Sequence, residues 1–395
     1  METFGDAVRR LRGEVALREV ARLAHLDAGH LSRVERGTRP PNVELARALD
    51  QVLGTGGELA ALITEARPRR WDVDQPRPWA TVELLHRMRA GAITSGTAES
   101  IQAAAFELCC EYPIREASVL RSEAYGWLGE VTRLLRQPVG LAVHKELLTA
   151  AGWLTLLTGC LEYDMGMRAG AEATRLGALE LGREGRNPEI VGWAYEMAAW
   201  FALTQCRYRD VLDAAEAGQA AAPNGSAAVQ LAGQRAKAYA RLRDAEAVRD
   251  ALEWGRERLA NMPYPRRPDH HFVVDPAKWD FYAMDAYRLA QDDERAAHHA
   301  RTVLELGTSP EGERAPMRMA EARLTLAAVA ARGGELEQAV TTGIDALGAT
   351  RKSLPSLLMV AGELDGELTR RYPGETEAAD FREVLVSVRD GVQPA

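Results

Sequence analysis

Four of the eight histidines occur as two adjacent pairs, His270–His271 and His298–His299. Histidine is the most common metal ligand and a frequent acid–base catalyst, so these pairs could in principle carry chemistry. Neighbouring residues on a helix point about 100° apart, and neither pair has the i, i+4 spacing of a helical zinc motif. The sequence also lacks a Gly-rich phosphate loop and a GxSxG nucleophile elbow. We therefore expect no catalytic residues, no metal ion and no cofactor, and we do not expect an enzyme.

A second group of residues, near the N-terminus, has types and spacing suited to DNA binding. An arginine such as Arg33 can donate two hydrogen bonds to a guanine, which discriminates against other bases by about 1–3 kcal/mol. The small residues Ala28 and Gly29 allow close backbone approach or contact with a thymine methyl group. Arg36 and Arg39 are suited to phosphate contacts, which position a protein on DNA without reading its sequence. The candidate DNA-binding residues are Ala28, Gly29, His30, Ser32, Arg33, Arg36, Thr38 and Arg39.

Short helices must position these residues, and the first 65 residues show five helical patterns. The second helix is expected from Ala16 to Ala24. The third is expected from Ala28 to Arg36, with Asp27 as its N-cap and Gly37 at its end. Two helices of this length joined by a three- or four-residue turn form a helix-turn-helix, whose second helix enters the major groove of DNA.

The run from Leu17 to Pro41 resembles the helix-turn-helix of phage repressors and other Xre-type regulators. The resemblance belongs to segment 1–65 and implies a double-stranded DNA operator and a homodimer that binds two half-sites. Leu17 stands where the family often has a phosphate-binding Gln, Ala16 where Ser or Thr caps the helix, and His25 where Gly is usual. Each departure should weaken DNA binding or helix stability slightly. The matching residues are Glu19, Ala21, Leu31, Ser32, Val34, Glu35, Gly37 and Pro40.

Charge is distributed unevenly along the chain. The net charge is -8, yet residues 1–70 hold 12 Arg against 10 Asp or Glu. A mildly basic first segment on an acidic remainder fits a protein with one DNA-facing module. Residues 66–80 are rich in proline and arginine, which predicts a semi-rigid linker between a domain over 1–65 and a domain over 81–395.

Residues 81–395 show no persuasive strand pattern and instead repeat paired helices, so we expect an all-α protein. Small residues four apart recur on the second helix of successive pairs, where they would let a neighbouring helix pack closely. The pattern is typical of an α-solenoid of tetratricopeptide-like repeats. Segment 269–278 also resembles one in helix-turn-helix regulators of high-GC bacteria that carry tetratricopeptide-like domains. The recurring small pairs are Ala169/Ala173, Ala247/Ala251, Ala296/Ala300 and Ala339/Gly343, and Val211/Ala215 fits with one substitution.

Such a solenoid presents a concave surface formed by the first helix of each pair. Counting back from the small residues indicates which side chains face this surface. For the aromatic ones, ordinary core packing is the alternative. Segment 269–278 likewise either contacts a ligand or simply folds onto the next helix pair. The candidate ligand-binding residues are Glu196, Trp200, Tyr239, Lys278, Phe281, Asp285 and Arg288.

The sequence thus predicts a transcriptional regulator that binds DNA and senses a small molecule, peptide or protein through its helical repeats. The alternative is a protein–protein adaptor whose helix-turn-helix has become a docking module. The longest uncharged stretch, Leu147 to Leu161, has 15 residues, fewer than the roughly 20 that span a membrane. Because no apolar leader follows Met1, we expect a cytoplasmic protein without membrane contact.

Overall fold

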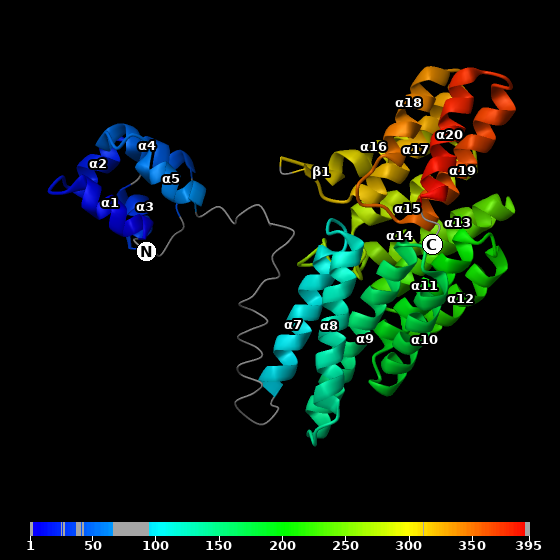
Figure 1. Cartoon of the computed structure of the whole chain (residues 1–395), viewed down its shortest axis with the longest axis horizontal. Helices are drawn as coiled ribbons and strands as arrows, with labels where there is room; N and C mark the ends of the chain where they lie inside the picture. Colours follow the sequence, from blue (N-terminus) through cyan, green and yellow to red (C-terminus); the bar gives the residue numbers. More distant parts are fainter. Residues whose placement is uncertain are drawn as a thin grey trace. The chain divides into compact units, whose positions relative to one another are not determined.

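The structure is a computed structural model that describes residues 3–24, 26, 28–36, 41, 43–65, 95–310 and 312–391. These residues are almost entirely helical, which confirms the all-α prediction (Figure 1). The chain divides into two compact units, residues 1–86 and 87–395. We call the described part of the first unit the head and the described part of the second unit the body. The predicted linker over 66–80 lies outside the described residues.

The head consists of short helices whose apolar stripes meet in one core. Val8, Val20, Leu31, Leu49 and Leu59 are each completely buried in it. Spacings of three and four residues place the apolar side chains of each helix on one face, and that face turns inward. The head helices are α1 (Phe4–Arg12), α2 (Leu17–Leu23), α3 (Ala28–Glu35), α4 (Val43–Leu53) and α5 (Glu58–Glu65).

Helix caps explain where two of the head helices begin. Thr3 accepts a hydrogen bond from the backbone N–H of Asp6 and thereby starts α1. Asp50, on α4, accepts from the backbone N–H groups of Leu59 and Ala60 at 2.9 and 2.8 Å and so anchors the start of α5. In contrast, α2 follows Ala16, which makes no side-chain cap, as its type predicts.

The body is a succession of antiparallel helix pairs. Its helices are α7 (Ser95–Glu111), α8 (Ala117–Leu135), α9 (Leu141–Asp164), α10 (Arg168–Glu184), α11 (Pro188–Thr204), α12 (Tyr208–Ala221), α13 (Ser226–Leu242), α14 (Ala245–Ala260), α15 (Pro276–Leu289), α16 (Asp293–Gly307), α17 (Pro316–Gly333), α18 (Leu336–Leu347), α19 (Leu354–Arg371) and α20 (Thr376–Asp390). Strands β1 (Thr308–Ser309) and β2 (Gly312–Glu313) pair antiparallel between α16 and α17. No helix among the described residues combines the length and apolarity that a membrane span requires.

The small residues fall on the second helix of each pair, as predicted, and most of them are buried. Ala296 and Ala300 on α16 are completely buried, and the pairs on α12 and α18 are buried as well. The prediction is wrong for α10, where Ala169 and Ala173 are exposed and Ala171 is buried instead. Several small residues adjoin there, and only Ala171 continues into the buried stripe at positions 175, 178 and 182.

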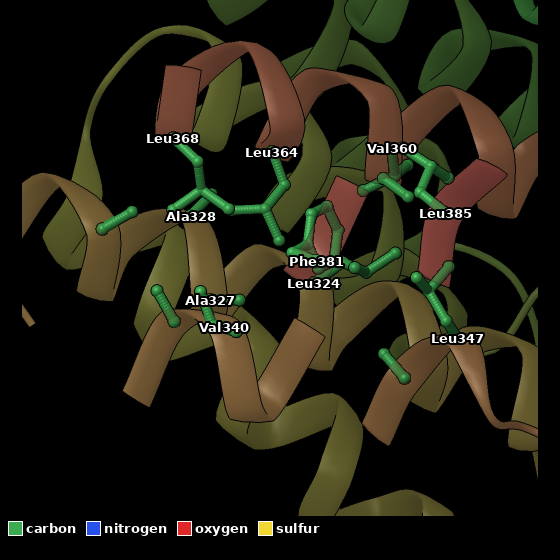
Figure 2. Packing of buried hydrophobic residues seen from close by; sticks show 14 of the residues in the cluster. Leu324, Ala327, Ala328, Val340, Leu347, Val360, Leu364, Leu368, Phe381 and Leu385 are labelled. Carbon is green, nitrogen blue, oxygen red and sulfur yellow. The ribbon is translucent and has the colours of Figure 1, made fainter. Parts of the chain in front are cut away.

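The last two helix pairs show how the body builds its core. Figure 2 shows Phe381 of α20 among Leu324 of α17, Leu364 of α19 and Leu385 of α20, all of them nearly or completely buried. Gly343 on α18 lies in the same core, and a Cβ there would come within 2.7 Å of the Phe381 ring. A small residue at this position is therefore what lets the aromatic ring lie against the helix.

The first helix of each successive pair belongs to an inner row that closes on itself. The row consists of α9, α11, α13, α15, α17 and α19. Successive members of the row contact one another from α9 to α19, and α19 also contacts α9 and α11. Arg351, just before α19, donates to Asp164 Oδ2 at 2.8 Å, and the Tyr112 hydroxyl donates to the same oxygen at 2.7 Å. We call Tyr112, Asp164 and Arg351 the clasp. It joins residues 187 positions apart, which an open solenoid would keep distant.

Candidate functional site

Helices α2 and α3 pack through their apolar faces and leave the polar face of α3 outward. Val20 and Ala21 of α2 and Leu31 and Val34 of α3 are buried. Of the predicted DNA-binding residues, Gly29, Arg33 and Arg36 are exposed and Ala28, His30 and Ser32 are half-buried. Thr38 and Arg39 lie outside the described residues, as do Asp27, Gly37 and His25.

Helix α3 is fixed to α1 by the buried carboxylate of Glu35. Arg12 donates to Glu35 Oε1 from Nε at 3.1 Å, and Arg9 donates to the Glu35 carbonyl oxygen at 2.7 Å. Gly5 allows this close approach, because a Cβ there would lie 2.2 Å from the same carbonyl oxygen. Two of the arginines that make the first segment basic therefore hold the head together.

The body contains a cavity of about 120 Å³ between the helices of its inner row. Helices α11, α13, α15, α17 and α19 all contribute, together with segment 268–271. The polar side chains that line this cavity are more buried than is usual. In most proteins, charged residues are rarely buried unless they are paired. The buried polar residues that line it are Glu196, Gln230, Gln234, Lys237, His270, Lys278, Glu321, Ser353 and Ser356.

Glu196 of α11 holds two glutamines of α13 in a fixed orientation. Gln234 donates its amide to Glu196 Oε1 at 2.7 Å. Burial raises the pKa of Glu196, and hydrogen bonds from Gln230 and Gln234 partly offset that rise. Because both amide nitrogens serve Glu196, both amide oxygens remain as acceptors, and neither has a partner within the described part of the chain.

Two lysines enter the cavity in different ways. Lys278, at the start of α15, donates from Nζ to the backbone carbonyls of His271 and Val273, the second at 2.9 Å. Burial lowers the pKa of Lys278 to about 7. Lys237 of α13 instead lies with Nζ 4.3 Å from the ring centroid of Phe281, a cation–π contact.

The cavity wall on α17 carries a cation and a carboxylate one helical turn apart, Arg318 and Glu321. Burial raises the pKa of Glu321 to about 7 and lowers that of Arg318. Segment 268–271 contributes neutral rings, because burial lowers the pKa of His270 to about 4 and that of His271 well below its ordinary value. These histidines stack on aromatic neighbours, with the His271 and Tyr112 centroids 3.8 Å apart.

The structure brings together four of the seven predicted ligand-binding residues. Glu196, Trp200, Lys278 and Phe281 all line the cavity. Tyr239 does not line it, and its ring lies beside the Arg235 guanidinium, 5.9 Å from its centroid. It is on the inner helix α13 but on a different side from the cavity-lining residues.

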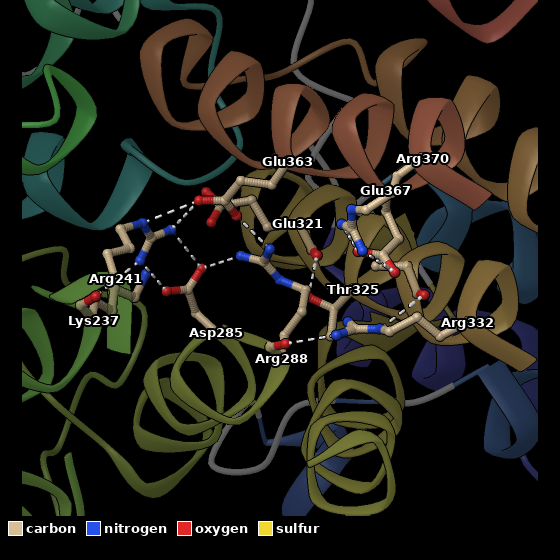
Figure 3. A network of polar contacts seen from close by, with 11 residues as sticks. Lys237, Arg241, Asp285, Arg288, Glu321, Thr325, Arg332, Glu363, Glu367 and Arg370 are labelled. Atoms are coloured by element: carbon tan, nitrogen blue, oxygen red, sulfur yellow. Dashed lines mark hydrogen bonds and ion pairs between the residues drawn. The ribbon is translucent and has the colours of Figure 1, made fainter. Parts of the chain in front are cut away.

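Asp285 and Arg288 also do not line the cavity, because they belong to a buried ion-pair network (Figure 3). Arg241 of α13 binds Asp285 at 2.8 Å and Glu363 of α19 at 2.9 Å. Arg288 pairs with the same two carboxylates. Both predicted residues lie on α15, a helix of the inner row. Their ion pairs connect α13 and α15 to α19.

Sequence reasoning missed the polar residues of α13 and α17 in the cavity. Gln230, Gln234 and Lys237 are spaced four and three apart, and Arg318 and Glu321 three apart. This spacing places each set on one helix face. A polar stripe inside an otherwise alanine-rich helix was the available signal, because such a stripe is unexpected on a face that packs against other helices.

Comparison with known proteins bears on the head. A family model described as a helix-turn-helix domain matches residues 3–63, a range that contains α1 to α4 and most of α5. No curated protein matches the chain. The helix-turn-helix assignment of the head thus rests on both the packing of α2 and α3 and the family model, and it indicates a DNA-binding regulator.

Proposed function

We propose that this protein is a sequence-specific transcriptional regulator that binds a double-stranded DNA operator as a homodimer and responds to an effector bound in its body. The observation that carries the proposal is the helix-turn-helix match over residues 3–63 together with the outward polar face of α3. The second helix of such a motif offers its N-terminal residues to base edges in the major groove. In this chain those residues are Ala28, Gly29, His30, Ser32 and Arg33.

The body supplies what an effector site needs. Its cavity is concave, with aromatic walls and convergent polar groups, features that small-molecule sites share. An effector changes DNA binding only if it favours one arrangement of the two heads of a dimer over another. Half-sites on one face of DNA lie about 34 Å apart, so a modest change in the body can move the heads out of register.

The test is DNA selection by the purified full-length protein, followed by affinity measurements on the selected duplex. We expect binding that weakens with salt, because phosphate contacts release counterions. Arg33→Ala should lower the affinity for the selected site by about 1–3 kcal/mol and relax the preference at one base pair. Arg36→Ala should weaken binding to all sequences alike and flatten the salt dependence by about one unit.

A matched control is Arg10→Ala, which removes the same charge from the head but from α1, where Arg10 pairs with Glu58. It should leave the sequence preference unchanged. Absence of any salt-dependent binding to duplex DNA would contradict the proposal and favour an adaptor. An Arg33→Ala variant with the same preferred site as the parent would show that α3 does not contact bases.

A further inference from the structure

The cavity in the body contains a buried cation that no carboxylate of the described residues contacts directly. Lys237 is 4% exposed, and among the described residues its ammonium makes no hydrogen bond or ion pair, only the contacts with the rings of Phe281 and Tyr282 at 4.3 and 5.2 Å. Burying an ammonium group without a hydrogen-bonded partner is costly. Such a group is retained at a cost in stability, which points to a negatively charged ligand that pairs with it.

Two further basic side chains line the same space. Arg318 lines the cavity from α17, and its guanidinium likewise has no hydrogen bond or ion pair within the described part of the body. Lys278 uses two of its three N–H groups on the carbonyls of His271 and Val273, which leaves one for a ligand. Lys237 and Arg318 thus bring positive charge from α13 and α17 to one cavity, and Lys278 of α15 adds an N–H donor.

The carboxylates of the cavity do not neutralise these cations by direct contact. Glu196 is engaged by the glutamine amides of α13. Glu321 is 6% exposed and forms no ion pair with any described residue, and burial, by raising its pKa, favours its neutral form. Gln230 and Gln234 line the same cavity, and their amide oxygens have no partner among the described residues. They are acceptors, and they call for a ligand N–H or O–H close to its negative group.

A second, wider cavity adjoins this one; we call the first the inner cavity and the second the outer cavity. This outer cavity has a volume of about 550 Å³ and shares Pro113, Pro268, Asp269, Ala315 and Arg318 with the inner one. Its lining includes Ile114, Tyr264 and Leu306, which are 59%, 70% and 51% exposed. Exposed apolar side chains beside a cavity mark a surface on which an apolar group is bound.

We propose that the inner cavity binds the head of a small organic acid, a carboxylate with a hydroxyl or amino group beside it, whose apolar body lies in the outer cavity. The carboxylate contacts Lys237, Arg318 and Lys278, and the neighbouring hydroxyl or amino group donates to Gln230 and Gln234. The inner volume, about 120 Å³, is below the 150 Å³ of a cavity known to hold benzene, so it accepts a small head group and not a peptide chain. The regulatory meaning of this site rests on the proposed function, whereas the binding itself does not.

The test uses the purified full chain and three probes that differ at one group each: 2-hydroxy-4-phenylbutyrate, 4-phenylbutyrate and 4-phenylbutyramide. Binding is followed by titration calorimetry and by tryptophan fluorescence, to which Trp200 in the cavity wall contributes. We expect saturable binding of the hydroxy acid. We expect the acid without the hydroxyl group to bind more weakly, and the amide about tenfold more weakly again, because it lacks the charge.

Variants on the cations separate a ligand site from an effect on folding. Lys237→Met and Arg318→Met should each lower the affinity for the two acids about tenfold and leave that for the amide unchanged. Arg235→Met is the matched control on α13, because Arg235 does not line the cavity, and it should leave all three affinities unchanged. Thermal unfolding of each variant verifies that the body is folded.

Equal affinities for the acid and the amide would overturn the proposal, as would cation variants that weaken all probes alike. Absence of binding by every probe at millimolar concentration would overturn it as well. The proposed function fails separately, by absence of salt-dependent DNA binding in the ligand-free protein. Saturable binding of the acid to a chain that does not bind DNA would therefore support the site and contradict the regulator.

Discussion

Removal of Arg351 should test whether the clasp closes the body. The side chain of Asp164 is completely buried, and its Oδ2 accepts from Arg351 and from the Tyr112 hydroxyl at 2.8 and 2.7 Å. Its other oxygen has no partner among the described residues. Arg351→Met therefore leaves a buried carboxylate with a single hydrogen bond. Breaking a buried ion pair from one side costs about 3–5 kcal/mol, and we expect a loss of that size in the free energy of unfolding.

The double variant Asp164→Leu/Arg351→Met separates the charge from the packing. It removes both ions and leaves the Tyr112 hydroxyl without its acceptor, which costs about 1–3 kcal/mol. The backbone carbonyls of Tyr112 and Lys352 lose their Arg351 donors in the single and the double variant alike. Apolar replacement of a whole buried pair is often neutral or stabilising. We therefore expect the double variant to be more stable than Arg351→Met alone.

Urea unfolding of the full chain, followed by tryptophan fluorescence, is the assay. Residues 1–65 contain no tryptophan, so the signal does not come from the head. Arg183→Met is the control, because Arg183 and its partner Glu180 are exposed, and it should cause no measurable change. If Arg351→Met were as stable as the parent, or if the double variant lost more than the single one, the clasp would not be a buried ion pair that holds α19 to α9.

Three further outcomes follow from single sites. Burial raises the pKa of Glu321 from 4.5 to about 7, so the protonated carboxyl stabilises the folded chain relative to the ionised one, fully below about pH 4.5 and no longer once the pH has risen through 7. Glu321→Gln should therefore stabilise the chain by about 3 kcal/mol at pH 8 and about 1 kcal/mol at pH 5. A pH-independent difference in urea unfolding would contradict this. Gly5→Ala should destabilise the head by about 1–3 kcal/mol, because the added Cβ collides with the Glu35 carbonyl oxygen. It should also lower the temperature at which DNA binding is lost. If DNA binding of the variant and the parent were lost at the same temperature, α1 and α3 would not pack this closely. Trp200→Ala should abolish most of the fluorescence response to 2-hydroxy-4-phenylbutyrate and Tyr239→Ala should preserve it, whereas equal responses would place the probe outside the cavity.

The local structure of this protein was predictable from its sequence. Helices α2 and α3 begin and end within about a turn of their predicted bounds, because apolar spacing and helix breakers act over a few residues. The pairing of helices in the body was predictable for the same reason. The one wrong register, at Ala169 and Ala173, arose where several small residues adjoin and local spacing does not distinguish the faces.

The candidate ligand site was predictable only in part. Glu196, Trp200, Lys278 and Phe281 were found because the repeat pattern indicates which helices are inner. Asp285 and Arg288 are chemically similar candidates on the same helix, yet they pair with Arg241 and Glu363. Which charged residue faces a ligand and which is neutralised by another helix depends on partners more than 40 positions away, and spacing within one helix carries no information on them.

The sequence by itself determined the helices, their pairing and the polar outer face of α3, since each depends on residues three or four apart. Tertiary structure alone decided that the inner row closes on itself. Closure brings Arg351 to Asp164 and Ser356 to Trp200, and it turns a concave surface into a cavity with buried charges. Small rotations between successive helix pairs add up along a solenoid, and only their sum decides whether α19 meets α9.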